Sequence, residues 1–319
     1  MQKLLLVTLI CSLFQMKTVA QGDQPADEIN TNTNHSYFKA RLTYLSNNVY
    51  NGRKDSLVVP YLTPSIGYYN KSGFFAKTSV SALVSGYAQR IDLVELEAGY
   101  RFQIHDQFSG SVSASRPFYN TASTSVKSET LGELDADFSW NIASAVSLNG
   151  GAGYMATTAN ADKYINLGLS HEFSFGENDE WSMEPSLAFN FGTRNYYDQY
   201  TKNRHLKTGK IKKSAKDSTV TGGGSIKTVV NTTITTVDAN KLLMLDGELS
   251  LSMTYDTGKW SFFATPTYAL PVNPAVYITT ITTDRTFTNG STTHNTQTSN
   301  STETISNTFY MELGVSYRF

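Results

Sequence analysis

Acidic residues recur at alternate positions in three stretches of the chain, a spacing that places side chains on one face of a β-strand. These carboxylates are Glu95, Glu97, Glu133, Asp135, Asp137, Asp246 and Glu248. Basic residues in similar alternating surroundings are Lys39, Arg41, Lys77 and Arg318. Charges of opposite sign that face a common space either orient and screen polar solutes there or pair with one another and fill the space.

Catalytic patterns are weak by comparison. None of the five histidines forms a recognisable nucleophile motif with a serine. His171 is the only one expected within a strand, on a face with Leu167, Leu169 and Phe173, which favours a packing or boundary role. We therefore expect no catalytic residues. We also expect no metal site, because histidines and cysteines are not paired, and no cofactor.

The elements that carry these residues are strands. Apolar and polar residues alternate almost throughout, with short Gly, Asn and Asp breaks, and helical periodicity is nearly absent. Pro60 and Pro64 each remove a backbone donor, so the second strand should be bulged or partly unpaired. We predict twelve strands, over residues 37–47, 57–69, 73–85, 91–103, 107–117, 131–142, 144–157, 163–175, 180–192, 242–256, 259–270 and 307–319.

The connections between these strands are sorted by length. Every second one is short, the others are longer on average, and the loops 193–241 and 271–306 are very long. This asymmetry is typical of a single transmembrane antiparallel β-barrel with short periplasmic turns and long extracellular loops. Trp140, Trp181 and Trp260 lie on apolar faces near the short turns, as expected of a membrane girdle. A secreted soluble β-sandwich shares the alternation but gives no reason for this sorting.

The N-terminal stretch MQKLLLVTLICSLFQMKTVAQ has the charge, apolar core and small residues of a secretory signal peptide, with cleavage expected after Ala20. Residues 21–36 would follow as a short periplasmic lead-in, and residues 37–319 as the barrel. Cys11 is the only cysteine and lies in this leader, so the fold does not depend on disulfides. The whole chain has 26 basic and 27 acidic residues, a balance that points to no nucleic-acid partner.

The C-terminal residues FYMELGVSYRF place apolar side chains at every second position and end on an aromatic. This stretch resembles the closing strand of Gram-negative outer-membrane β-barrel proteins, a porin-like class. The positions that match are Phe319, Tyr317, Val315 and Leu313. The resemblance implies a bacterial outer-membrane location, recognition of these residues by the barrel assembly machinery, and pairing of 307–319 with 37–47. Such pairing is physically required, because an open strand edge in lipid leaves backbone groups unsatisfied.

The interior of such a barrel can be wet or filled. Twelve strands fall between the side-chain-filled eight and the open sixteen, so both interpretations remain possible. Small inward residues favour open space; they include Ser109, Ser111, Ser113, Ser115, Gly151 and Gly153. The leading hypothesis is a passive channel for small polar or charged solutes. The alternative is a surface-interaction or structural barrel that acts through its long loops, and a membrane-embedded lipid hydrolase comes third.

The long loops have two features of their own. Loop 193–241 is strongly basic, and outer-membrane lipid phosphate, including that of lipopolysaccharide, would attract it. The alternative is an ordinary solvated loop. The threonine-rich segments 226–237 and 276–288 have high β-propensity, and we expect them to extend neighbouring strands as hairpins beyond the membrane.

Overall fold

The structure is a computed structural model that describes residues 35–54, 58–86, 88–123, 125–143, 146–158, 160–197, 227–287 and 289–319. The predicted signal peptide, most of the lead-in and residues 198–226 lie outside these ranges. The chain divides into two compact units. Their bounds are Met1–Thr193, Leu242–Asn273 and Ile305–Phe319 for the first, and Arg194–Lys241 and Pro274–Thr304 for the second.

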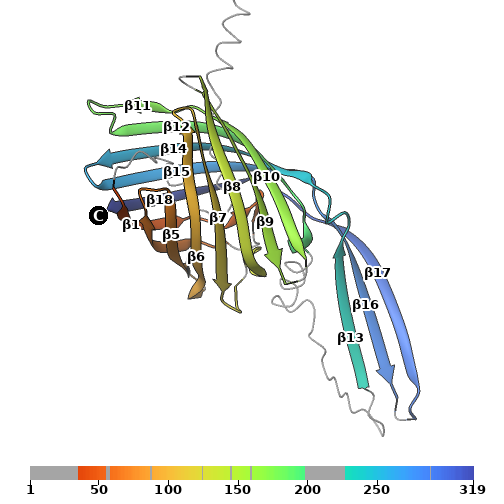
Figure 1. Cartoon of the computed structure of the whole chain (residues 1–319). Helices are drawn as coiled ribbons and strands as arrows, with labels where there is room; N and C mark the ends of the chain where they lie inside the picture. The colour runs from red at the N-terminus through yellow and green to blue at the C-terminus, as the bar shows by residue number, and fades with distance from the viewer. Residues whose placement is uncertain are drawn as a thin grey trace, which may run out of the picture. The chain divides into compact units, whose positions relative to one another are not determined.

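Twelve strands of the first unit form a closed antiparallel barrel, as predicted (Figure 1). In chain order they are β1 (Tyr37–Leu45), β4 (Tyr61–Tyr69), β5 (Phe74–Ser85), β6 (Ala88–His105), β7 (Phe108–Tyr119), β8 (Thr130–Ala143), β9 (Val146–Thr157), β10 (Ala161–Ser170), β12 (Trp181–Gly192), β14 (Leu243–Thr257), β15 (Trp260–Pro271) and β18 (Thr308–Arg318). Each pairs with the next, and β18 pairs with β1, so the ring has no open edge.

The C-terminal strand β18 closes the barrel by pairing with β1, as its resemblance to a closing strand predicts. The register runs from Lys39 opposite Arg318 to Leu45 opposite Glu312. The Phe319 N–H donates to the Phe38 carbonyl at 2.9 Å and extends the ladder to the last residue. The backbone of both end strands is thereby satisfied without water.

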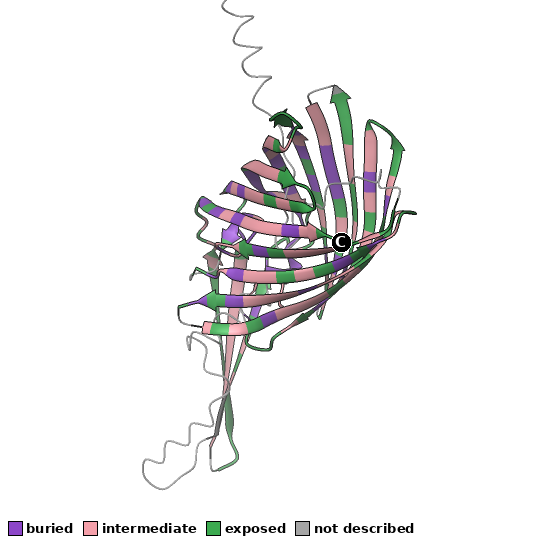
Figure 2. Ribbon diagram, turned by 90° about the vertical axis from the view of Figure 1, so that its left-hand side faces the viewer, coloured by how far each residue is buried: buried purple, intermediate pink, exposed green. Residues whose placement is uncertain are grey.

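The two faces of the strands differ in the way that the alternation predicts. Burial alternates from residue to residue along much of several barrel strands, such as β7 and β10 (Figure 2). Outward positions carry large exposed apolar side chains, such as Leu42 on β1, Leu134 on β8 and Leu249 on β14. The inward positions beside them are mostly polar and buried or half-buried, such as Thr43 and Glu133. An apolar outer surface around a polar interior is suited to a lipid bilayer rather than to water.

Two prolines interrupt the hydrogen-bond ladder. Pro64 pairs with Leu42 of β1, but neither it nor Thr63 is in register with β5, as expected for the second strand. Pro185 on β12 stands opposite His171, where a missing N–H breaks the neighbouring strand. The predicted strand 163–175 is therefore wrong in one respect. It divides into β10 and a short β11 (Phe173–Phe175), with His171 in the gap rather than within a strand.

The outer connections are less uniform than expected. Strands β5 and β6 continue toward each other until only Gly86 and one further residue separate them, so this third connection is as short as a periplasmic turn. The first connection instead contains a small hairpin of β2 (Val49–Tyr50) and β3 (Arg53–Lys54).

The second unit contains a three-stranded antiparallel sheet in the order β13–β16–β17. Its strands are β13 (Lys227–Thr236), β16 (Val276–Thr286) and β17 (Thr292–Thr302). The threonine-rich segments do form strands, and β13 pairs with β16 across a long sequence separation. No helix among the described residues is long and apolar enough to cross a membrane.

Candidate functional site: the barrel lumen

The alternation places all eleven charged residues singled out from the sequence on the inward face. Register makes Lys77 of β5 and Glu97 of β6 direct neighbours, and their side chains form an ion pair at 2.6 Å. On the other side of the ring, Asp135 of β8 accepts a hydrogen bond from the Tyr164 hydroxyl. Some inward charges therefore form ion pairs with each other, and others interact with neutral polar side chains at other positions around the ring.

The barrel has further inward charges that the sequence prediction does not include, although some of them follow the same alternation. Arg101 shares the face of Glu97 on β6, and Glu312 lies between the apolar residues of the closing strand. Asp92 is a different case, because it sits at a register shift in β6 where no simple alternation applies. The signal for Arg101 and Glu312 was present in the spacing, whereas a β-bulge has no clear sequence mark.

The outer half of the lumen contains the hairpin of β2 and β3. Asn51 and Gly52 form its two-residue turn with positive φ, 49° and 71°, a combination that matches the Asn-Gly hairpin preference. A Cβ on Gly52 would lie 2.8 Å from the Pro271 Cβ and 2.9 Å from the Asp246 Cβ. The hairpin tip therefore packs tightly against the inner wall at β15 and β14, which lie two and three positions around the ring from β1.

Arg53 fixes this hairpin to the wall. Its guanidinium donates to the carbonyls of Leu245 and Val272, each at 3.2 Å, and also to those of Asn51 and Asn273. The side chain of Arg53 is buried beside Asp246, which is itself fully buried. At the base of the loop, the Asn48 N–H donates to the Val59 carbonyl at 3.0 Å and closes the neck.

The same hairpin reaches toward the opposite side of the ring. Tyr50 and Asn51 share a small pocket with Tyr164 and Asn166 of β10 and with Asn190 of β12. These strands lie four and five positions around the ring from β1. The hairpin therefore crosses the outer half of the lumen and narrows it, a feature that only the Asn51-Gly52 dipeptide signals in the sequence.

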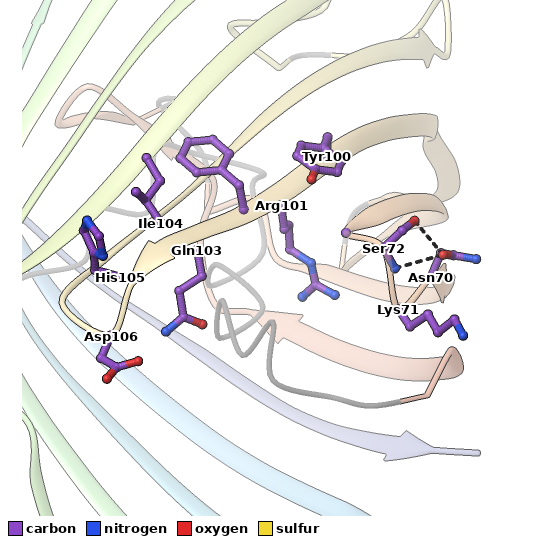
Figure 3. A pocket seen from close by; sticks show the side chains of 11 residues that line it. Asn70, Lys71, Ser72, Tyr100, Arg101, Gln103, Ile104, His105 and Asp106 are labelled. Carbon is purple, nitrogen blue, oxygen red and sulfur yellow. Dashed lines mark hydrogen bonds between the residues drawn. The ribbon is translucent and has the colours of Figure 1, made fainter.

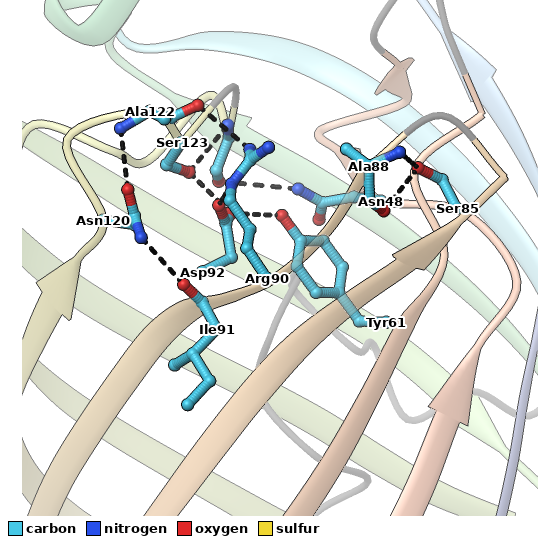
Figure 4. Close-up of polar contacts among 11 residues, drawn as sticks. Asn48, Tyr61, Ser85, Ala88, Arg90, Ile91, Asp92, Asn120, Ala122 and Ser123 are labelled. Carbon is cyan, nitrogen blue, oxygen red and sulfur yellow. Dashed lines mark hydrogen bonds and ion pairs between the residues drawn. The ribbon is translucent and has the colours of Figure 1, made fainter.

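A second loop, residues 120–129, is tied to the same mouth by Asp92 (Figure 4). The Asp92 carboxylate accepts from the Tyr61 hydroxyl at 2.5 Å, the Ser123 hydroxyl at 2.7 Å and Arg90 Nε at 2.8 Å. Lys127 of this loop forms an ion pair with Glu133 at 2.8 Å. Asp92 and Lys127 therefore hold this loop against the barrel wall.

The periplasmic half is lined differently. The inward face of β7 consists of the serines at 109, 111, 113 and 115. Gly151 and Gly153 of β9 lie instead beside Asn166 and Tyr164, whose side chains occupy the space next to these glycines. On the other side, Tyr37 and Tyr69 stack at 5.0 Å between ring centroids, and Phe75 continues the stack at 6.0 Å. This half therefore has one wall of small hydroxyl groups and one of aromatic rings.

At the rim, β6 projects beyond the turn that joins β4 to β5. Asn70–Gly73 and Tyr100–Asp106 line an open hollow of about 390 Å³ there (Figure 3). Arg101 and Gln103 project from one side of β6, whereas Tyr100 and Ile104 project from the other. Arg101 therefore lies near the rim, and its side chain belongs to the inner face of the barrel wall.

Aromatic side chains form a belt outside this same rim. The tryptophans at 140, 181 and 260 are each nearly half exposed and face outward close to the short turns. Trp260 packs against Tyr317 at 4.7 Å, and Tyr317 packs edge-on against Phe319 at 4.9 Å. The aromatic end of the chain is part of the belt.

His171 shows no catalytic geometry. Its ring packs edge-on against Phe173 with centroids 4.0 Å apart, and its Nδ1 is buried without a hydrogen-bond partner among the described residues. In the part of the chain that the structure describes, no serine or carboxylate hydrogen-bonds to this nitrogen to orient the ring as a general base would require. The arrangement fits the packing role expected from the sequence.

A closed, even-stranded antiparallel barrel with an apolar exterior, a girdle of aromatics and a polar interior defines the class of outer-membrane β-barrel proteins.

No protein-family model matches the sequence, and no curated protein matches it significantly. Among solved structures, the chain is similar to the KdgM porin, with 10% identity, a TM-score of 0.41, and coverage of 89% of this chain and 99% of that one. It is also similar to the NanC porin, with 11% identity, a TM-score of 0.41, and coverage of 88% and 100%. An outer membrane channel from Pseudomonas putida F1 follows at 10% identity, with a TM-score of 0.35 and coverage of 93% and 99%. Such distant similarity adds no argument about function.

Proposed function

We propose that this protein is a passive outer-membrane channel for small polar or charged solutes. The observation that carries the proposal is the periplasmic half of the lumen, where the small serines of β7 form one wall and charged and aromatic residues form another. Small side chains on the inner face of a twelve-stranded ring leave space for water. The hairpin at Asn51 and Gly52 then sets the narrowest part of the path and selects solutes by size.

Planar bilayers test the proposal. The purified full chain should give discrete conductance steps, and Glu95→Gln combined with Asp135→Asn should change the ion selectivity, because both carboxylates face the lumen. A control is Asp284→Asn in the three-stranded sheet, which removes one negative charge from a strand that is not part of the barrel, compared with the two charges removed by the double variant. Bilayers that remain silent across preparations with a confirmed folded barrel would contradict the channel.

A second candidate function is surface interaction through residues 193–241 and 271–306. It is favoured by the three-stranded sheet, which is a compact unit of its own and whose strand β17 is exposed along almost its entire length. Removal of 274–304 should then abolish a binding or envelope phenotype and leave conductance unchanged. A lipid hydrolase is least favoured, and lipase activity that disappears in His171→Ala would reverse that order.

The lipid and assembly partners follow from the same proposal. The apolar exterior requires outer-membrane lipid, and the basic residues of loop 193–241 would attract lipopolysaccharide phosphates. The barrel assembly machinery would recognise Phe319, Tyr317, Val315 and Leu313. Phe319→Ala should lower the amount of heat-modifiable folded barrel in membranes, whereas Asn307→Ala at the other end of the strand should not.

A further inference from the structure

Two arginines on the inner wall of the periplasmic half are held by aromatic rings. The Arg101 guanidinium carbon lies 4.5 Å from the ring centroid of Tyr69, and that of Arg318 lies 4.8 Å from the ring centroid of Tyr37. Because Tyr37 and Tyr69 stack on each other, the two cations are brought close together from β6 and β18, with β5, β4 and β1 between those strands. Each cation therefore lies over an aromatic ring; Arg101 is buried, whereas Arg318 is exposed.

A ring fixes a cation without neutralising it. An aromatic face attracts a guanidinium through its quadrupole but carries no net charge. Among the described residues, neither Arg101 nor Arg318 has a carboxylate within ion-pair distance, in contrast to Lys77, which is paired with Glu97 at 2.6 Å. The wall around Tyr37 therefore retains positive charge that faces the lumen.

Arg101 adds an unmet hydrogen-bonding requirement. Only 7% of its surface is exposed. Its Nη2 donates to the Tyr37 hydroxyl at 3.3 Å, but its Nε and Nη1 are buried and have no hydrogen-bond partner among the described residues. A buried charged donor without an acceptor is costly, and the acceptors that suit a guanidinium fork are the paired oxygens of a carboxylate or phosphate.

We propose that Arg101 and Arg318, held on Tyr69 and Tyr37, form a binding site for the carboxylate or phosphate group of a small solute at the periplasmic end of the lumen. Lys39 lies directly opposite Arg318 in the β1–β18 register and adds a third positive charge to the wall. Arg41, stacked over Phe263 at 4.1 Å, continues it toward the outer half. The inference rests on the proposed channel function and adds the chemical class of solute that the channel favours.

The test is titration of the full-length, detergent-folded protein with citrate and with inorganic phosphate at low ionic strength, with glycerol as the uncharged probe. Citrate should bind and glycerol should not. Arg101→Gln and Arg318→Gln should each weaken citrate binding by about tenfold, the loss expected for one charge-assisted hydrogen bond. Lys127→Gln, which removes a positive charge from the outer half, should leave it unchanged.

Variants that disturb packing are separated from variants that remove the site in two ways. Every variant must keep the heat-dependent gel shift of a folded barrel. Arg101→Lys retains the charge but loses the planar fork, so it should bind citrate with an affinity between that of the wild type and that of Arg101→Gln. Equal binding by all three would overturn the proposal.

Bilayer recordings distinguish failure of this site from failure of the channel. Under a KCl gradient the wild type should favour anions, and Arg101→Gln should shift the reversal potential toward cations. A conducting wild type that does not bind citrate overturns the anion site and leaves the channel in place. A protein that does not conduct but loses citrate binding in Arg101→Gln supports the site and overturns the channel.

Discussion

The two halves of the lumen use the same kinds of residues for opposite purposes. In the outer half, Asp92, Arg53 and Lys127 hold loops against the wall, and each has hydrogen-bond or ion-pair partners in the protein. In the periplasmic half, Arg101 and Arg318 are positioned by rings rather than by carboxylates. Inward charges in this barrel therefore have two roles. A charge that is paired with other protein groups holds a loop at the constriction, whereas a charge that lies over an aromatic ring keeps its electrostatic attraction for solutes in the lumen.

The largest expected effect is on the constriction. Deletion of residues 49–54 removes the hairpin that crosses the outer half, so single-channel conductance should rise several-fold. Deletion of 287–291, the turn between β16 and β17, is the control and should leave conductance unchanged. Equal conductance in both deletion variants would show that the hairpin does not limit the path and would remove the contrast between the halves.

Replacing carboxylates tests whether the charges of the two halves differ in their contribution to stability. Asp92→Asn disturbs three short hydrogen bonds around a buried group and should lower the free energy of unfolding by about 1–3 kcal/mol. Asp137→Asn, on the exposed side of the periplasmic half, should change it by about 0.5 kcal/mol or less. Urea unfolding in lipid vesicles, followed by tryptophan fluorescence, measures both. A larger loss for Asp137→Asn would reverse the comparison.

Glycine variants sharpen the same point at the hairpin tip. Gly52 and Gly290 both have positive φ, 71° and 80°, so alanine should cost about 1 kcal/mol of backbone strain at either. Only at Gly52 would the added Cβ meet the wall, whereas nothing lies within 4 Å at Gly290. Gly52→Ala should therefore raise conductance or its noise, and Gly290→Ala should not. Identical recordings would mean that the tip is not tightly seated.

The smallest effect is expected in the wide half. Ser113→Tyr adds a ring to the serine wall, but the outer constriction dominates the resistance of the path, so conductance should fall only slightly. Ser79→Tyr, on the inward face of β5, is a comparison at a more crowded position. A large drop in Ser113→Tyr would place the narrowest point in the periplasmic half instead.

The sequence predicted the barrel well because its evidence is local. Period-two alternation marks each strand wherever one face is apolar, and the ending on Phe319 indicated which strands close the ring. The path of the first loop could not be predicted in the same way. The role of Arg53 depends on the carbonyls of Leu245 and Val272, about two hundred residues away, and no spacing in the chain records that contact.

Proline explains another difference between the predicted and the observed strands, the break between β10 and β11. Pro185 lies on β12, but its effect falls on the neighbouring strand at His171, so the predicted strand 163–175 carries no mark of its own break. The pairing of β13 with β16 is likewise a relation between distant segments. The β-propensity of these two segments predicted that they would form strands, but it could not predict which strand each would pair with.

The pairing of β1 with β18 also has a consequence for biogenesis. Because β1 and β18 are the first and last strands of the ring, β18 must be synthesised before the ring can close, and a chain shortened before β18 keeps an unpaired strand edge. A circularly permuted gene that fused the two ends and began at Lys259 would preserve every pairing while moving the terminal aromatic inside the chain. Such a permutant would show whether the C-terminal aromatic is needed for pairing of the two strands or only for delivery of the polypeptide to the membrane.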